Sequence, residues 1–108
     1  MPSTKDYADF ILEQLSELDA ITARKMMGEY ILYYQNKIIG GIYDNRFLVK
    51  PTKSALEKMP EASMAIPYEG AKPMLMVDNV DNRDFLKELI VEMYDELPEM
   101  KKIVTLQK

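Results

Sequence analysis

The side chains of this chain that could hold a charged ligand are concentrated in one segment. Residues 24–53 carry six cations and two carboxylates, so the segment has a charge of +4 and the remainder −8. This uneven distribution leaves room for a local basic face that could bind a protein or an acidic surface. A simpler alternative is that a basic hairpin offsets acidic helices within one domain. The candidate partner-binding residues are Lys25, Lys37, Arg46, Lys50 and Lys53.

The groups that most often carry catalysis are missing. The chain has no histidine and no cysteine, so it cannot build Ser-His-Asp or Cys-His nucleophilic systems, a disulfide or a thiolate metal site. Carboxylates could still act as an acid–base pair or bind Mg²⁺. Asp84, Glu88 and Glu92, however, have the spacing of an exposed stripe on one helix. We therefore expect a non-enzymatic protein with no catalytic residues, cofactor or metal.

Four tyrosines lie among the cations of the basic segment. Tyr30, Tyr33, Tyr34 and Tyr43 on a sheet would resemble a stacking platform for single-stranded nucleic acid. Alternation along a strand, however, sends Tyr33 to the face opposite Tyr30 and Tyr34. A sheet with one half-exposed face explains the pattern more simply. Direct nucleic-acid binding by the basic sheet stays an alternative function.

The methionines allow two interpretations. Nine methionines are many for 108 residues, and flexible thioethers fill core gaps as readily as they form adaptable binding surfaces. Met26 and Met27, or Met74 and Met76, could line a groove for a protein. Met74 and Met76 share one strand face, which suits a core equally well.

Composition predicts one globular domain spanning residues 1–108. Apolar residues make up 47% of the chain and charged residues 30%, which is typical of a soluble domain of this size. No apolar run approaches the roughly 18 residues that a membrane span requires, and the N-terminus has no export signal. The cytoplasm is the expected location. A net charge of −4 argues against the general basic footprint of a nucleic-acid binder.

Periodicity and turn residues predict an α+β fold in the order α-β-β-β-α-β-β-α. The expected architecture has two layers: a mostly antiparallel five-stranded sheet, with the helices packed on one face. Asn and Asp tolerate the positive φ of tight hairpins, so residues 35–36 and 44–45 are expected turns. Gly40 and Gly41 interrupt a strand and predict a bulge or a close helix crossing, not a phosphate loop. The expected helices are 4–18, a short one from Thr52 or Ser54 to about Lys58, and one capped by Asp81 or Asn82 that includes Leu97. The expected strands are 30–34, 37–43, 46–50, 63–66 and 74–77. Residues from about 99 to 108 are expected to form either a loose tail or, from Lys101, one more helical turn.

The segment from Ala23 to Tyr30 reads Ala-Arg-Lys-Met-Met-Gly-Glu-Tyr. It resembles the Arg-Lys-Met-Phe-Gly pattern of the N-terminal domain of the TfoX/Sxy family, with Met27 where an aromatic residue is common. The other similar segments are Leu32-Tyr33, Lys37, Asp44-Asn45, Leu48 to Thr52, Pro67-Tyr68 and Lys72-Pro73-Met74.

The resemblance implies a bacterial domain related to transcriptional co-activators of natural competence, which act with a cyclic-AMP receptor protein. Full-length regulators of that kind carry a C-terminal domain that this stand-alone chain lacks. The family supplies no catalytic residues. The expected function is a small interaction domain, a transcriptional co-regulator that acts through protein contacts. Its protein partner is unidentified, with the transcription machinery as one candidate. Homodimerisation through an uncovered sheet edge or through the methionine-rich surface is a further alternative.

Overall fold

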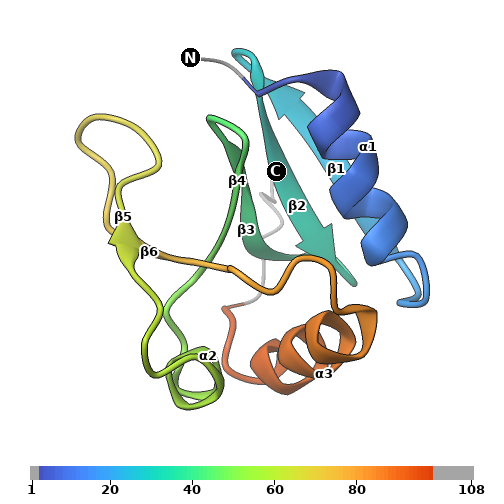
Figure 1. The fold of residues 1–108 in the computed structure, drawn as a ribbon, viewed down its shortest axis with the longest axis vertical. Coiled ribbons are helices and arrows are strands. Elements are labelled where there is room, and N and C mark those ends of the chain that lie inside the picture. The colour runs from blue at the N-terminus through green and yellow to red at the C-terminus, as the bar shows by residue number, and fades with distance from the viewer. Residues whose placement is uncertain (1–2, 99–108) are drawn as a thin grey trace, which may run out of the picture.

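The computed structural model describes residues 3–98 and shows an α+β fold (Figure 1). Its six strands form one antiparallel sheet in the order β1-β2-β3-β4-β6-β5. The sheet therefore has one strand more than the five expected. Residues 99–108, the expected tail, lie outside the described residues. The elements are α1 (Lys5–Gln14), β1 (Ile21–Met26), β2 (Glu29–Tyr34), β3 (Lys37–Tyr43), β4 (Arg46–Val49), α2 (Lys53–Lys58), β5 (Met64–Ala65), β6 (Met74–Met76) and α3 (Arg83–Tyr94).

Three two-residue turns join β1 to β4 into a continuous meander. Both residues of each turn have positive φ, at 48° and 70° for Gln35 and Asn36 and at 53° and 55° for Asp44 and Asn45. These two turns confirm the prediction, because such φ values match the twist of paired strands. The third turn, at Met27 (53°) and Gly28 (86°), was not expected.

The sequence pattern did not predict β1, because the first expected strand was 30–34. Five of its six residues are exposed and only Ile21 is partly buried, and β1 is an edge strand that pairs with β2 alone. An exposed edge strand needs no apolar alternation, and the alternation is the signal that identifies strands in a sequence. Arg24 and Lys25 lie on this edge, where charged side chains oppose pairing with other chains.

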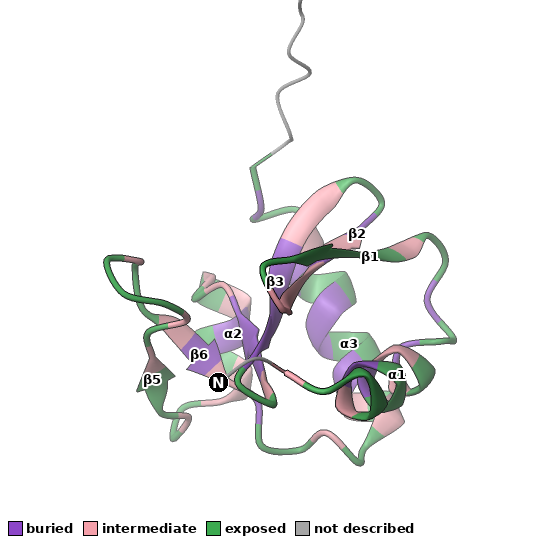
Figure 2. Cartoon of the chain, turned by 90° about the horizontal axis from the view of Figure 1, so that it is seen from above, coloured by how far each residue is buried: buried purple, intermediate pink, exposed green. Residues whose placement is uncertain are grey.

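The helices pack against one face of the sheet, as the sequence predicted. Seen from above, α1 and α3 lie on the same side of β1, β2 and β3 (Figure 2). Side chains from all three helices join inward-facing strand residues in a single core. The largest fully buried members are Ile11, Leu15, Leu32, Ile39, Ile42, Phe47, Leu75, Leu86, Leu89, Ile90 and Met93.

Each helix begins at a side chain that accepts a hydrogen bond from its first turn. The caps are Thr4 for α1, Thr52 for α2 and Asn82 for α3, and such caps satisfy N–H groups that lack a helical partner. The structure therefore selects Asn82 over Asp81. The first helix is shorter than the expected 4–18, although Leu15 and Leu18 beyond its end are still buried.

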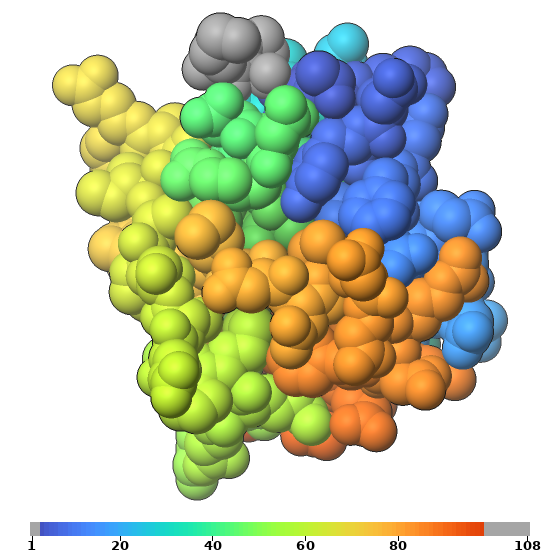
Figure 3. Space-filling model, viewed as in Figure 1, coloured from blue at the N-terminus to red at the C-terminus, as the bar shows by residue number. Residues whose placement is uncertain are grey.

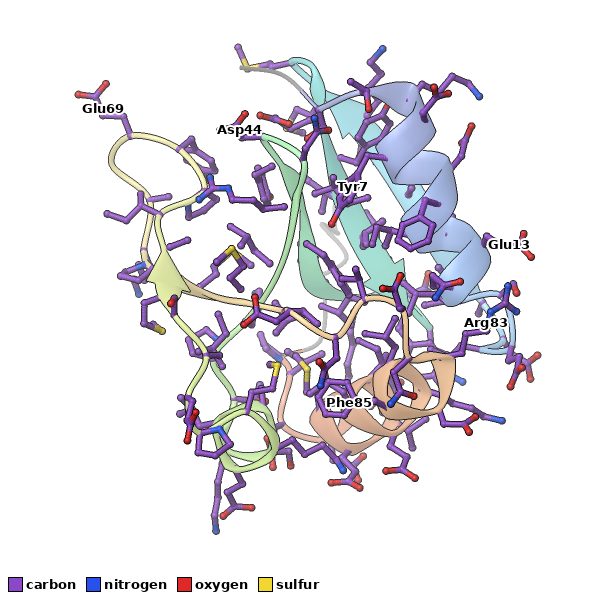
Figure 4. All side chains as sticks on the ribbon, in the orientation of Figure 1. Tyr7, Glu13, Asp44, Glu69, Arg83 and Phe85 are labelled. Atoms are coloured by element: carbon purple, nitrogen blue, oxygen red, sulfur yellow. The ribbon has the colours of Figure 1, made fainter. Side chains whose placement is uncertain are left out.

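The segment that leads into α3 contacts the end of α1. In the space-filling view the orange segment leading into α3 crosses the front and meets the blue helix α1 (Figure 3). Arg83 and Glu13 point toward one another (Figure 4), with Nη2 and Oε2 separated by 3.1 Å. Arg83 Nε also donates to Gln14 Oε1 at 3.2 Å, and Gln14 Nε2 donates to the Val80 carbonyl oxygen at 2.8 Å.

Gly40 and Gly41 lie where the sheet has no room for a side chain. The register of β2 and β3 shifts between Leu32 and Tyr33, which confirms the expected bulge. A Cβ on Gly40 would collide with the backbone of Leu48 and Val49, and one on Gly41 with the Tyr30 carbonyl oxygen and the Tyr43 ring. Neighbouring strands and a tyrosine, not a crossing helix, make the close approach.

Within residues 3–98, no helix is both long and apolar enough to cross a membrane.

Candidate partner-binding groove

The five candidate cations lie on different elements and do not form one patch. Lys25 is exposed on the edge strand β1, and Lys53 is exposed at the start of α2. The Arg46 side chain folds back on its own hairpin, where Nε donates to the Tyr43 carbonyl oxygen at 3.2 Å. Lys50 comes directly after β4 and is half-buried. The basic segment therefore spreads its charge over several surfaces.

Lys37 contacts the last turn of α3. Its ammonium group donates to the Tyr94 carbonyl oxygen at 3.0 Å and lies 4.0 Å from the centre of the Tyr94 ring. A cation at this place favours the negative end of the helix dipole and the face of the aromatic ring. Lys37 thus fastens α3 to the sheet, a contact that the sequence did not reveal.

Lys50 lines a groove on the sheet face opposite the helices. The groove has a volume of about 440 Å³ and lies between the outer face of β2 and β3 and the segment that joins β5 to β6. This volume falls in the range of roughly 300–1,000 Å³ that is usual for ligand sites. The outer-face groove is lined by Ile31, Ile38, Gly40, Tyr43, Lys50, Pro51, Pro67, Tyr68, Ala71, Lys72, Pro73 and Met74.

Two neighbouring aromatic side chains, tilted relative to one another, form part of the groove wall. The Tyr43 ring lies over Gly41, and its centre is 6.2 Å from that of Tyr68, with 52° between the planes. Burial, and then the neighbouring Tyr68, raise the pKa of the Tyr43 hydroxyl above its ordinary value. Tyr43 therefore stays neutral across physiological pH. Tyr68 is 63% exposed, so its ring is available to an occupant of the groove.

The charged groups that line the groove are both cations. They are Lys50 and Lys72, and neither makes an ion pair with any of residues 3–98. Glu69 lies in the same loop as Lys72, but its side chain points away from the molecule (Figure 4). The groove thus combines an apolar lining with unpaired positive charge in a chain whose net charge is −4.

Carboxylates do not gather at this groove or elsewhere in the described part of the chain. Among residues 3–98, no group of three or more acidic side chains could hold a metal ion. Glu88 and Glu92 of the acidic helix stripe are exposed and each lie 3.4 Å from Lys58 Nζ. These contacts agree with the expected solvated face.

The sequence of residues 13–97 matches the family model of the TfoX N-terminal domain. The chain belongs to the TfoX N-terminal domain family. It is also similar to an uncharacterized 12.7 kDa protein in the trpE 5′ region of Spirochaeta aurantia. The two are 35% identical over 80 residues, which cover 74% of this chain and 70% of that protein. No solved structure matches the chain.

Three segments that carry the TfoX resemblance meet at the groove. They are Lys50-Pro51 after β4, Pro67-Tyr68 and Lys72-Pro73-Met74. They come together because β6 pairs with β4, with Met76 opposite Leu48 and Leu75 opposite Val49. In this TfoX N-terminal domain the family-like segments therefore include residues that form turns and residues that line a surface groove.

Sequence reasoning missed Lys72 and Arg24 as candidate binding residues. Lys72 lies outside the basic segment, and only the β4–β6 pairing brings it to the groove. Arg24 is opposite Ile31 in the β1–β2 register, so it lies on the outer face beside the groove floor. Once β1 is recognised as a strand, the sequence could have placed Arg24, because successive residues of a strand point to opposite faces and Arg24 then lies on the face opposite Lys25.

The methionines divide among the roles that were weighed for them. Met93 is fully buried in the core, whereas Met27 is 96% exposed at the tip of the β1–β2 hairpin. Met74 and Met76 share the outer face and are half-buried, and Met74 lines the groove. The adaptable-surface interpretation therefore fits Met74.

Proposed function

We propose that this TfoX N-terminal domain is a small regulatory domain that acts by binding another protein, as a co-regulator of transcription without catalytic chemistry of its own. The observation that carries this proposal is the outer-face groove. Exposed apolar concavities rimmed by polar groups are typical of interaction sites. The absence of histidine and cysteine from the chain also favours a binding role.

A protein partner is favoured over nucleic acid by the placement of the cations. Lys25, Lys37 and Lys53 lie on separate elements, and Lys37 is held at the end of α3. A strand of nucleic acid is usually followed by a continuous positively charged groove with stacking aromatics. The described surface offers an apolar hollow with two lysines instead.

Affinity capture from bacterial lysate with quantitative mass spectrometry tests the proposal. The wild-type domain is compared with the double variant Ile38→Glu/Lys72→Glu, which places two negative charges in the groove. Lys25→Glu is the matched control, because it reverses an exposed charge away from the groove. Proteins held by the wild type and by Lys25→Glu but lost from the double variant are the expected partners.

The circular-dichroism spectrum and thermal unfolding of each variant show that its fold is intact before capture. Equal capture of every protein by a folded double variant would refute the proposal. A folded wild-type domain that captures nucleic acid alone, with affinity that falls steeply as salt rises, would support the nucleic-acid alternative.

A further inference from the structure

The lining of the outer-face groove limits what its occupant can be. Ile31 and Ile38 supply the sheet side, and Met74 and the prolines of the β5–β6 segment supply the opposite wall. Binding is favourable here for an occupant that removes this apolar surface from water. A small hydrophilic anion would leave most of the lining hydrated and gain little.

The charges at the groove require a negatively charged complement. Lys50 follows β4 and Lys72 lies on the β5–β6 segment, so the two lysines reach the groove from different segments of the chain. Neither is paired within residues 3–98. Arg24, beside Ile31 on the same sheet face, adds a third positive charge near the floor.

On the basis of the proposed function, we infer that the groove binds a short acidic segment of the partner protein. An apolar side chain of that segment enters between Ile38 and Met74, and flanking carboxylates pair with Lys50 and Lys72. A peptide fits this lining because a single backbone can carry an apolar side chain for the apolar surface and separated carboxylates for the two lysines. The exposed Tyr68 ring packs along the bound segment.

Selection from a display library of random peptides, about 12 residues long, tests this inference on the immobilised full-length chain. Enriched peptides are expected to carry aspartate or glutamate within a few residues of a large apolar side chain. Selection is repeated on the charge-reversed variant Lys50→Glu/Lys72→Glu. Enrichment there is expected to switch to peptides with lysine or arginine at the flanking positions.

The most enriched peptide is then measured by fluorescence anisotropy in about 0.15 M salt, where contacts beyond about 8 Å are screened. Lys50→Glu/Lys72→Glu is expected to weaken its binding about tenfold or more, and replacement of its acidic residues by amides is expected to do the same. Lys25→Glu is expected to change the affinity less than about twofold. Amide chemical shifts on binding should map to the groove.

Three results would overturn the inference: enriched peptides without acidic residues, binding that is insensitive to both lysines, or displacement by single-stranded DNA more readily than by the unlabelled peptide. Failure of the peptide selection with lysate capture still dependent on the groove would reject the acidic segment and leave the proposed function standing. Lysate capture that is independent of the groove would reject the proposed function itself.

Discussion

The ammonium group of Lys37 donates to the carbonyl oxygen of Tyr94 at 3.0 Å, across 57 positions of sequence. This contact joins the first residue of β3 to the last residue of α3. It gives Lys37 a structural role, so a charge reversal there would test stability and binding at once. Lys50 and Lys72 are therefore better probes of partner binding.

Lys37→Met is expected to lower the free energy of unfolding by about 1–2 kcal/mol, because it removes a cation from the helix end and from the Tyr94 ring. Urea unfolding followed by circular dichroism measures the loss. Lys25→Met is the control, with an expected change below about 0.5 kcal/mol, because Lys25 is exposed on the sheet edge. Equal losses in the two variants would contradict the role of Lys37.

Gly41→Val is expected to destabilise the fold by about 2–3 kcal/mol or more, because the new side chain must displace the Tyr30 backbone and the Tyr43 ring. Thermal unfolding measures the effect. Gly70→Ala is the control: Gly70 has a φ of 88° but no atom within 4 Å of an added Cβ, so it loses only about 1 kcal/mol. An unchanged melting temperature in Gly41→Val would show that the sheet is not closely packed there.

Asn82→Ala is expected to cost about 1 kcal/mol, because the Asn82 side chain accepts a hydrogen bond from the Phe85 N–H at 3.0 Å. Asp81→Ala tests the other residue that the sequence allowed as a cap. Its expected effect is below about 0.5 kcal/mol. Chemical denaturation measures the free energy of unfolding of the two variants. A larger loss of stability in Asp81→Ala than in Asn82→Ala would show that Asn82 is not the cap of α3.

Glu96 gives the stability of the fold a dependence on pH. The Ser54 N–H and then the Ser54 hydroxyl hydrogen-bond to its carboxylate, at 2.9 and 2.7 Å, and they lower the pKa of Glu96 in the folded state. A carboxyl group with a lowered pKa stabilises the fold above its ordinary pKa. That contribution is lost as the pH falls through the lowered value.

Glu96→Gln should therefore be less stable than the wild type near neutral pH, and the gap should narrow in acid. Urea unfolding of both proteins across the pH range measures the gap. Glu57→Gln, an exposed substitution on α2, should show no such convergence. A gap that is constant with pH would exclude the ionised carboxylate as its cause.

Local sequence signals predicted most of the fold, because its turns and helix caps are determined by residues that are neighbours in the sequence. Asn and Asp marked two of the hairpins, and helical periodicity marked the core faces of α1 and α3. Met27 hid the third hairpin, because methionine is not expected at a φ of 53°. The edge strand before it was hidden as well, because little of it is buried.

The groove could not be predicted, because it depends on a pairing between distant strands. Lys50 and Lys72 belong to separate segments, and no local pattern states that β6 lies beside β4. The same reason explains Lys37, whose role depends on where α3 ends. Charge along the sequence predicted a basic surface, but the structure places the five candidate cations on separate elements, and of these only Lys50 lines the groove.

The three consecutive two-residue turns also bear on how the chain folds. Every pairing from β1 to β4 joins neighbours in sequence, so the meander closes only short loops and is expected to form early. Helix α3 follows more than 30 residues after β4, and its buried leucines complete the core. Helix α1 is made before the meander, so during synthesis the part of the inner face that α3 covers stays open until α3 has left the ribosome. We expect the chain to be most prone to aggregation during that interval, because apolar strand surface is then exposed to water.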